Sequence, residues 1–302
     1  ASDVYKRQYV YQNEADIPLL IGVDEEGGTV VRVSSNPNLR ETPFLSPKDT
    51  YADGGWDAVK QDAEEKADLL LSLGINVNLA PVCDMTSDEY GFMYDRSFSS
   101  DVDMENRYVR TVVETSKSKK LGTVLKHFPG YGNNSDTHTG IAYDNRDYSE
   151  FENTDFKPFY QGIESGADCI LVSHNIVNCM DSEYPASLSQ KVHDILRNEF
   201  KFDGVIMTDD LIMDAITDFT GDEAAAVTAA KCGNDLLCCS SVNTQYPAVL
   251  EAVQNGEIPE AQVDASVKRI LKWKQNLGIF SIDTYQKKVK STEPTDTVGS
   301  EE

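Results

Sequence analysis

The residues best suited to chemistry lie between Lys126 and His138. This stretch places a lysine, two of the four histidines of the chain and an aspartate within thirteen residues. Two glycines and a proline force the backbone into a loop there, because glycine tolerates positive φ and proline fixes φ. In the triplet Asp136-Thr137-His138, the carboxylate could hold the imidazole as an oriented proton carrier. The stretch therefore predicts a loop that transfers protons.

Polar side chains also follow the other predicted strands, at the point where each strand ends. In parallel α/β folds, the carboxyl ends of the strands form the face that carries function. One such residue would mean little, but polar side chains after five successive strands indicate a site at that face. The residues are Asp24, Arg32, Asp84, Lys126, His127, His174, Asn175, Asp209 and Asp210.

Several of these residues also have a purely structural interpretation. Asp24 and Asp84 could cap helices or pair with arginines, and His174 could fill the mouth of a barrel. In the pair Asp209-Asp210, we expect Asp210 to cap a helix. These alternatives leave the strand-end pattern as the main argument for a site.

Metal binding needs two or three converging ligands, and His127, His138 and Asp209 could supply them. The adjacent Lys126 would oppose a cation, and with His127 it could instead form a structural network. We therefore expect no metal site, and nothing in the sequence indicates an organic cofactor.

The composition is that of an acidic protein without an extended apolar segment. The formal net charge is −24, from 51 acidic and 27 basic side chains, a balance that repels phosphate backbones and anionic lipids. No run approaches the roughly 20 apolar residues that a membrane helix requires. We therefore expect a soluble protein, a monomer, that neither binds nucleic acid nor spans a membrane. The six cysteines lack the spacing of a disulfide scaffold or a zinc ribbon, which indicates free thiols.

The chain alternates strand-like and helix-like segments. This order predicts βα units around a parallel sheet, either a (β/α)8 barrel with a part missing or an open doubly wound sheet. Neither a GxGxxG after a strand nor a Walker-type GxxxxGK occurs, which argues against nucleotide binding. The expected strands are 17–23, 75–82, 122–125, 169–173, 204–208 and 234–239.

Five motifs resemble glycoside hydrolase family 3, in particular its single-domain β-N-acetylglucosaminidases (β-hexosaminidases). That subgroup has a pattern close to K-H-F-P-G-H-G, a spacer and D-[ST]-H, and this chain has KHFPGYGNNSDTH. Further segments are similar to family motifs and occur in the same order. They are IGVDEEGG, Arg32 at eight residues after Asp24, DRSF and GVIMTDDL. The resemblance covers residues 18–280.

The resemblance implies a TIM-type (β/α)8 barrel and a retaining, two-step hydrolysis. Asp209 would attack the anomeric carbon and form a glycosyl-enzyme, and His138, oriented by Asp136, would be the acid/base. The positions that match sugar-binding residues of the family are Asp24, Arg32, Arg96, Lys126 and His127, and the strand-end residue His174 is expected to join them.

The chain departs from the family pattern at three places. Tyr131 stands where KHFPGHG has its second histidine, and the spacer 133–135 is one residue shorter than usual. Only 23 residues precede Asp24, and no first barrel strand is evident. We therefore expect an irregular leading segment over 1–16, a barrel over 17–280 that lacks or modifies its first strand, and a polar, disordered tail over 281–302.

The function expected from these observations is that of an exo-acting β-N-acetylglucosaminidase, with peptidoglycan-derived muropeptides or similar glycans as substrates. A β-glucosidase or β-xylosidase, an N-acetylglucosaminide phosphorylase, and a degenerate barrel that binds sugar without turnover are the alternatives. The chain does not begin with Met and its first eight residues have no signal-peptide core, so the compartment stays open between cytoplasmic and extracytoplasmic.

Overall fold

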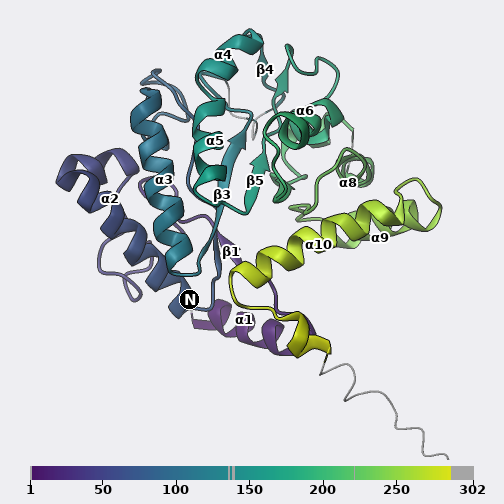
Figure 1. The fold of residues 1–302 in the computed structure, drawn as a ribbon, viewed down its shortest axis with the longest axis horizontal. Coiled ribbons are helices and arrows are strands. Elements are labelled where there is room, and N and C mark those ends of the chain that lie inside the picture. Colours follow the sequence, from purple (N-terminus) through teal and green to yellow (C-terminus); the bar gives the residue numbers. More distant parts are fainter. Residues whose placement is uncertain (1, 135–136, 138–139, 221, 287–302) are drawn as a thin grey trace, which may run out of the picture.

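A curved sheet of parallel strands organises the molecule (Figure 1). The computed structural model describes residues 2–134, 137, 140–220 and 222–286. Each strand of the sheet pairs in parallel with its neighbours, and a single parallel bridge from Met207 to Leu236 extends the last strand. The order is β1 (Gly22–Val23), β2 (Val77–Asn78), β3 (Gly122–Phe128), β5 (Cys169–Val172) and β7 (Val205–Thr208). The expectation of an α/β fold with a parallel sheet is confirmed.

Most positions of the strands are apolar because both faces of the sheet are covered, as in other parallel sheets. Every residue of β3, β5 and β7 is buried. Alternate residues point to opposite faces. Leu125, Ile170 and Ile206 belong to the cluster that packs under the outer helices, whereas their neighbours join a second cluster with Trp273.

Three helices lie side by side on the outer face of the sheet, α2 (Pro47–Ser72), α3 (Val102–Ser118) and α5 (Phe156–Glu164). The first turn of α2 is capped by Ser46, which accepts a hydrogen bond from the amide of Asp49. Further helices are α4 (Tyr148–Asn153), α6 (Gln190–Asp194) with a π turn (Ile195–Glu199), α7 (Asp214–Thr217), α8 (Asp222–Lys231), α9 (Val242–Gln254) and α10 (Glu260–Asn276), and a 3-10 turn spans Ala186–Leu188.

The start of the chain differs from expectation, because 1–16 is not irregular. Helix α1 (Ser2–Glu14) occupies most of it, and the Gln12 amide exchanges two hydrogen bonds with the backbone of Leu19. Asn76 also bonds the backbone of residues 19 and 21. Side chains therefore bond backbone groups of Leu19 and Ile21, and only Gly22–Val23 of the predicted first strand is part of the sheet.

Two further differences concern short elements. Strands β4 (Tyr143–Asp144) and β6 (Ile176–Val177) form a separate parallel pair that the sequence pattern did not reveal, and 234–239 contributes the one bridge instead of a full strand. The tail expected over 281–302 lies outside the described residues from position 287 onward.

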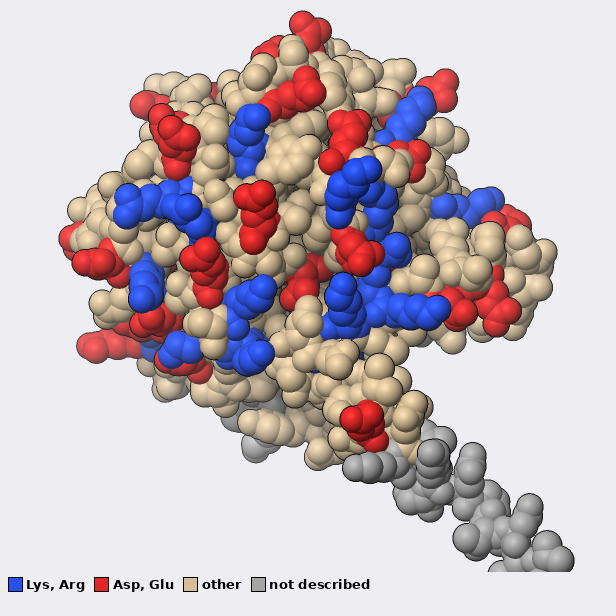
Figure 2. Space-filling model, in the orientation of Figure 1, with Lys and Arg blue, Asp and Glu red and all other residues tan. Residues whose placement is uncertain are grey.

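Charged side chains of both signs are interspersed on the face seen in Figure 2. This distribution fits a solvated surface that carries the excess of acidic residues. Within the described residues, no helix combines the length and the apolar content that a membrane crossing needs.

Candidate active site

A cavity of about 570 Å³ opens at the carboxyl ends of the parallel strands. Its size is typical of small-ligand sites. Seven residues singled out from the sequence line it together, in agreement with the strand-end argument. They are Asp24, Arg32, Arg96, Lys126, His127, Asp209 and Asp210.

Asp209 follows β7 directly, and its carboxylate faces this cavity. Its amide donates to the carbonyl of Val172 in β5, which fixes the backbone at the strand end, and Oδ1 accepts the amide of Asp210 at 2.9 Å. Burial opposes the negative charge, but His174, His127, the Asp210 amide and Lys126 outweigh it, so the pKa of Asp209 is lowered. Among the described residues, none donates a hydrogen bond to Oδ2. The site therefore holds an ionised carboxylate with one oxygen available.

Lys126 joins two carboxylates in the wall of the cavity. Its Nζ lies 2.6 Å from Oδ1 of Asp24 and 2.6 Å from Oε1 of Glu26. The side chain of Asp24 is 38% exposed, whereas those of Lys126 and Glu26 are 3% and 2% exposed. Asp24 is thus the carboxylate of this cluster that a ligand can reach.

Glu26 is the buried centre of the same cluster. Nε and Nη2 of Arg96 donate to its two carboxylate oxygens at 2.9 and 2.7 Å. This bidentate geometry strengthens an ion pair. Burial alone would raise the pKa of Glu26, but Lys126 and Arg96 lower it to about 2. Glu26 therefore stays ionised and holds both cations in place.

His127 is held by Asp84, a fully buried aspartate at the end of the strand-like run before it. Oδ2 of Asp84 lies 2.6 Å from Nδ1 of His127 and accepts the His127 amide. Because the carboxylate only accepts, Nδ1 carries a proton, and Nε2 lies 3.3 Å from Nη2 of Arg96. Asp84 is therefore an orienting partner of a cavity residue.

His174 lies behind the cavity wall, fully buried. Nδ1 is 2.7 Å from the hydroxyl of Ser187, and Nε2 is 3.0 Å from the carbonyl of Asp210. His174 therefore does not line the cavity, in contrast to the expected contact with substrate, and it contacts the backbone next to Asp209. Asp210 does not cap a helix, since its carboxylate bonds the amides of Ile212 and Ser240.

The expected proton carrier, Asp136 with His138, lies outside the described residues. The loop that precedes this segment is held in place by Tyr131, whose side chain is buried. Its amide donates to Oδ1 of Asp84 at 2.7 Å, and its hydroxyl bonds the hydroxyl of Thr137. Its ring meets that of His127 edge-on at 5.3 Å. Tyr131 thus packs into the site wall at the position where the family pattern has histidine.

A sequence profile for the glycosyl hydrolase family 3 N-terminal domain matches residues 2–273. The match contains all strands and all cavity residues described above. The chain belongs to glycosyl hydrolase family 3. This finding confirms the resemblance inferred from the motifs, and with it the class of enzyme.

Curated relatives in family 3 include a β-hexosaminidase from Hydrogenovibrio crunogenus, 34% identical over 252 residues, which are 81% of this chain and 70% of that protein. A β-hexosaminidase from Nitrosomonas eutropha is 33% identical over 230 residues, 74% of this chain and 65% of that one. A solved family 3 β-N-acetylglucosaminidase from Paenibacillus sp. str. FPU-7 superposes with a TM-score of 0.84 at 28% identity, over 98% of this chain and 56% of that chain. The chain thus spans between about half and 70% of these longer proteins.

Two features of the site are not predicted from the sequence, the central position of Glu26 and the orienting role of Asp84. Of the run Asp24-Glu25-Glu26, the family motif points to Asp24 alone. The available signal was a third acidic residue next to the Gly27-Gly28 pair, where the chain leaves the strand. Within the described residues, no three His, Cys, Asp or Glu side chains converge as a metal site would require.

Proposed function

We propose that this family 3 protein is a retaining, exo-acting β-N-acetylglucosaminidase. Relatives named β-hexosaminidase, 33–34% identical to this chain, support the substrate class. The observation that carries the proposal is the Asp209 carboxylate, ionised and turned into the cavity at the end of β7. An anionic oxygen in that position is what a nucleophile toward an anomeric carbon needs.

The proposed reaction has two steps. In the first, Oδ2 of Asp209 bonds to the anomeric carbon while the bond to the leaving oxygen breaks, and that oxygen takes a proton from His138. In the second, His138 removes a proton from water, whose oxygen replaces Asp209 on the same carbon. Asp136 would hold the imidazole in the required tautomer. The roles of Asp136 and His138 rest on the match to the family motif.

The sugar would be held by the polar wall opposite Asp209. Asp24 is the accessible acceptor for ring hydroxyls, and Arg32, which makes no ion pair with a described residue, supplies donors. Lys126, Arg96 and His127 line the same wall. Lys126 and Arg96 share the carboxylate of Glu26, and Arg96 also contacts His127, so these residues fix the shape of the wall as well as contacting the sugar. We assign His174 to the support of Asp209.

The natural substrates would be glycans that end in β-N-acetylglucosamine, such as peptidoglycan-derived muropeptides. A panel of 4-nitrophenyl β-glycosides tests this, and the N-acetylglucosaminide should be cleaved in strong preference to the glucoside and xyloside. Proton NMR of the first product formed should show the β anomer, as a retaining mechanism demands. Preference for glucose or xylose, or a first product of α configuration, would contradict the proposal.

The same assay in phosphate buffer separates hydrolysis from phosphorolysis, because a phosphorylase would release N-acetylglucosamine 1-phosphate. Calorimetric titration with N-acetylglucosamine tests the remaining alternative, a barrel that binds sugar without turnover. Binding without turnover in the folded protein would identify a non-catalytic sugar-binding barrel.

A further inference from the structure

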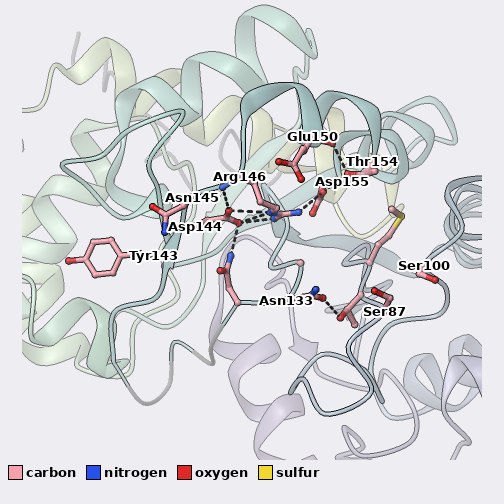
Figure 3. Close-up of a pocket in the computed structure, with 14 residues that line it drawn as sticks. Ser87, Ser100, Asn133, Tyr143, Asp144, Asn145, Arg146, Glu150, Thr154 and Asp155 are labelled. Atoms are coloured by element: carbon pink, nitrogen blue, oxygen red, sulfur yellow. Dashed lines mark hydrogen bonds and ion pairs between the residues drawn. The ribbon is translucent and has the colours of Figure 1, made fainter.

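The chain on both sides of residues 135–139, the segment that carries Asp136 and His138, is tied to the side chain of Arg146. Figure 3 shows the guanidinium of Arg146 between the carboxylates of Asp144 and Asp155. On the entry side, Nη2 of Arg146 donates to the carbonyl of Gly130 at 3.2 Å. The guanidinium also packs on Gly132, where a Cβ would lie 2.7 Å from Cζ of Arg146. The backbone that leads into the segment therefore packs against the guanidinium of Arg146.

The exit side is held through Asp144. Its Oδ2 accepts Nη2 of Arg146 at 2.7 Å and also Nδ2 of Asn134 at 2.5 Å. Asp144 ends β4, which pairs with β6 and so anchors the chain after the segment. One carboxylate thus links the residue before the segment to the strand after it, and Arg146 holds that carboxylate.

Charge and burial make this arginine hard to replace. Asp144 and Asp155 are 1% and 3% exposed, and Arg146 pairs with both, at 2.7 and 2.9 Å. Its guanidinium also lies over the ring of Phe151, 4.2 Å from the centroid. The planar guanidinium offers five N–H groups in fixed directions to the two carboxylates and the backbone carbonyl, whereas the ammonium of a lysine is a compact charge with three N–H groups.

The Arg146 cluster lies outside the catalytic cavity and connects to it through the loop. Its three charged members line a different hollow, of about 640 Å³, and none of them lines the cavity of Asp209. The residue after Gly130 is Tyr131, whose amide holds Asp84 and through it His127. Arg146 therefore contacts the site indirectly, through the backbone of Gly130 and Tyr131.

We propose that Arg146 is a positioning residue, which holds the two ends of the 135–139 segment at a set separation and thereby sets the place of the acid/base His138. This inference rests on the proposed function for its kinetic readout. It predicts that a change at Arg146 acts on proton transfer to the leaving group more than on the attack by Asp209.

Arg146→Lys is the test variant, because it keeps a positive charge beside the buried carboxylates and loses the fork. Asn134→Ala is a second variant, which removes one tie of the segment and leaves every ion pair intact. Arg197→Lys is the matched control. Arg197 also joins a buried carboxylate, Asp235, to backbone carbonyls, but at the start of β7, the end of the strand away from the cavity.

Two measurements are made on the full chain. The first is kcat/KM for N-acetylglucosaminides with a good leaving group (2,4-dinitrophenyl) and a poor one (phenyl). Arg146→Lys should lower the phenyl value about 100-fold, the lower end of what general acid catalysis contributes, and the dinitrophenyl value about threefold or less. Asn134→Ala should lower the phenyl value about tenfold, as expected for one lost bond to a charged group, and Arg197→Lys should lower both equally or not at all.

The second measurement is hydrogen exchange of peptides that cover 130–144, which needs no activity. Exchange there should rise in Arg146→Lys and Asn134→Ala and stay unchanged in Arg197→Lys. Equal losses for both leaving groups in Arg146→Lys, or exchange at 130–144 no faster than in the control, would overturn the inference and leave the proposed function standing. If the wild type cleaved no glycoside, the proposed function would fail, and exchange alone would decide whether Arg146 holds the segment.

Discussion

The ammonium of Lys126 lies 2.6 Å from Oε1 of Glu26, and both side chains are almost completely buried in the wall of the catalytic cavity. The pair joins the end of β3 to the chain that follows β1. Although burial acts against the charge of Lys126, Glu26 and then Asp24 raise its pKa above the ordinary value. A buried pair of this kind holds a site in shape, but it is costly to break from one side.

Glu26→Gln should therefore destabilise the protein strongly. It leaves Lys126 and Arg96 without their shared carboxylate, and we expect the free energy of unfolding to fall by about 3–5 kcal/mol, measured by urea denaturation. Glu65→Gln is the control, because Glu65 pairs with Arg40 at 3.1 Å but is 45% exposed, and a surface pair contributes about 0–1 kcal/mol. Similar losses in the two variants would contradict the central role of Glu26.

The pH dependence of the free energy of unfolding should reflect the low pKa of Glu26. The pKa of Glu26 is about 2 in the folded protein, against 4.5 for an ordinary glutamate, so its contribution is complete above pH 4.5 and is lost as the pH falls toward 2. The shift corresponds to about 3 kcal/mol. Unfolding in urea across this pH range should show the decline in the wild type and a smaller decline in Glu26→Gln. An identical decline in both would show that other groups cause it.

The proposed acid role of His138 predicts a selective loss. His138→Ala should slow cleavage of phenyl glycosides about 100-fold or more, and that of dinitrophenyl glycosides much less, because a good leaving group departs without a proton. The measurement is kcat/KM across a series of aryl N-acetylglucosaminides. Asp136→Asn should show the same selectivity with a smaller loss. Equal loss for all leaving groups would argue against the general acid.

The glycine at position 130 should be intolerant of a side chain for a steric reason. Gly130 has φ of 122°, and a Cβ there would lie 2.8 Å from Cβ of Asp155 and overlap its carboxylate. Gly140 has φ of 139°, but no atom of a described residue lies within 4 Å of such a Cβ. Gly130→Ala should therefore cost about 1–3 kcal/mol more than Gly140→Ala in urea unfolding. Equal costs would mean that backbone strain alone matters.

Much of the site followed from one local rule, that functional residues follow parallel strands. The rule found Asp24, Lys126, His127 and Asp209, because each lies directly after a run of apolar residues. It misplaced His174, which also follows a strand but is held from behind by Ser187, thirteen residues later. The position of a residue after a strand does not by itself tell whether its side chain lines the cavity or is buried beside it.

The parts that escaped prediction depend on contacts across long stretches of sequence. Glu26 acquires its role from Arg96, seventy residues away, and Asp84 from His127, forty-three residues away. The helix α1 escaped because its sequence has a weak apolar pattern, and the side chain of Gln12 ties the end of this helix to the backbone of Leu19. Such pairings are visible only after the sheet has brought the strands together.

The central claim is that Asp209 attacks the anomeric carbon and becomes glycosylated. The direct test is to treat the protein with a 5-fluoro-N-acetylglucosaminyl fluoride, whose glycosyl-enzyme hydrolyses slowly, and to map the adduct by mass spectrometry. We predict one added sugar on Asp209, no adduct in Asp209→Asn, and a loss of turnover of about 10⁴-fold or more in that variant. An adduct on another residue, or undiminished turnover by Asp209→Asn, would contradict the assignment.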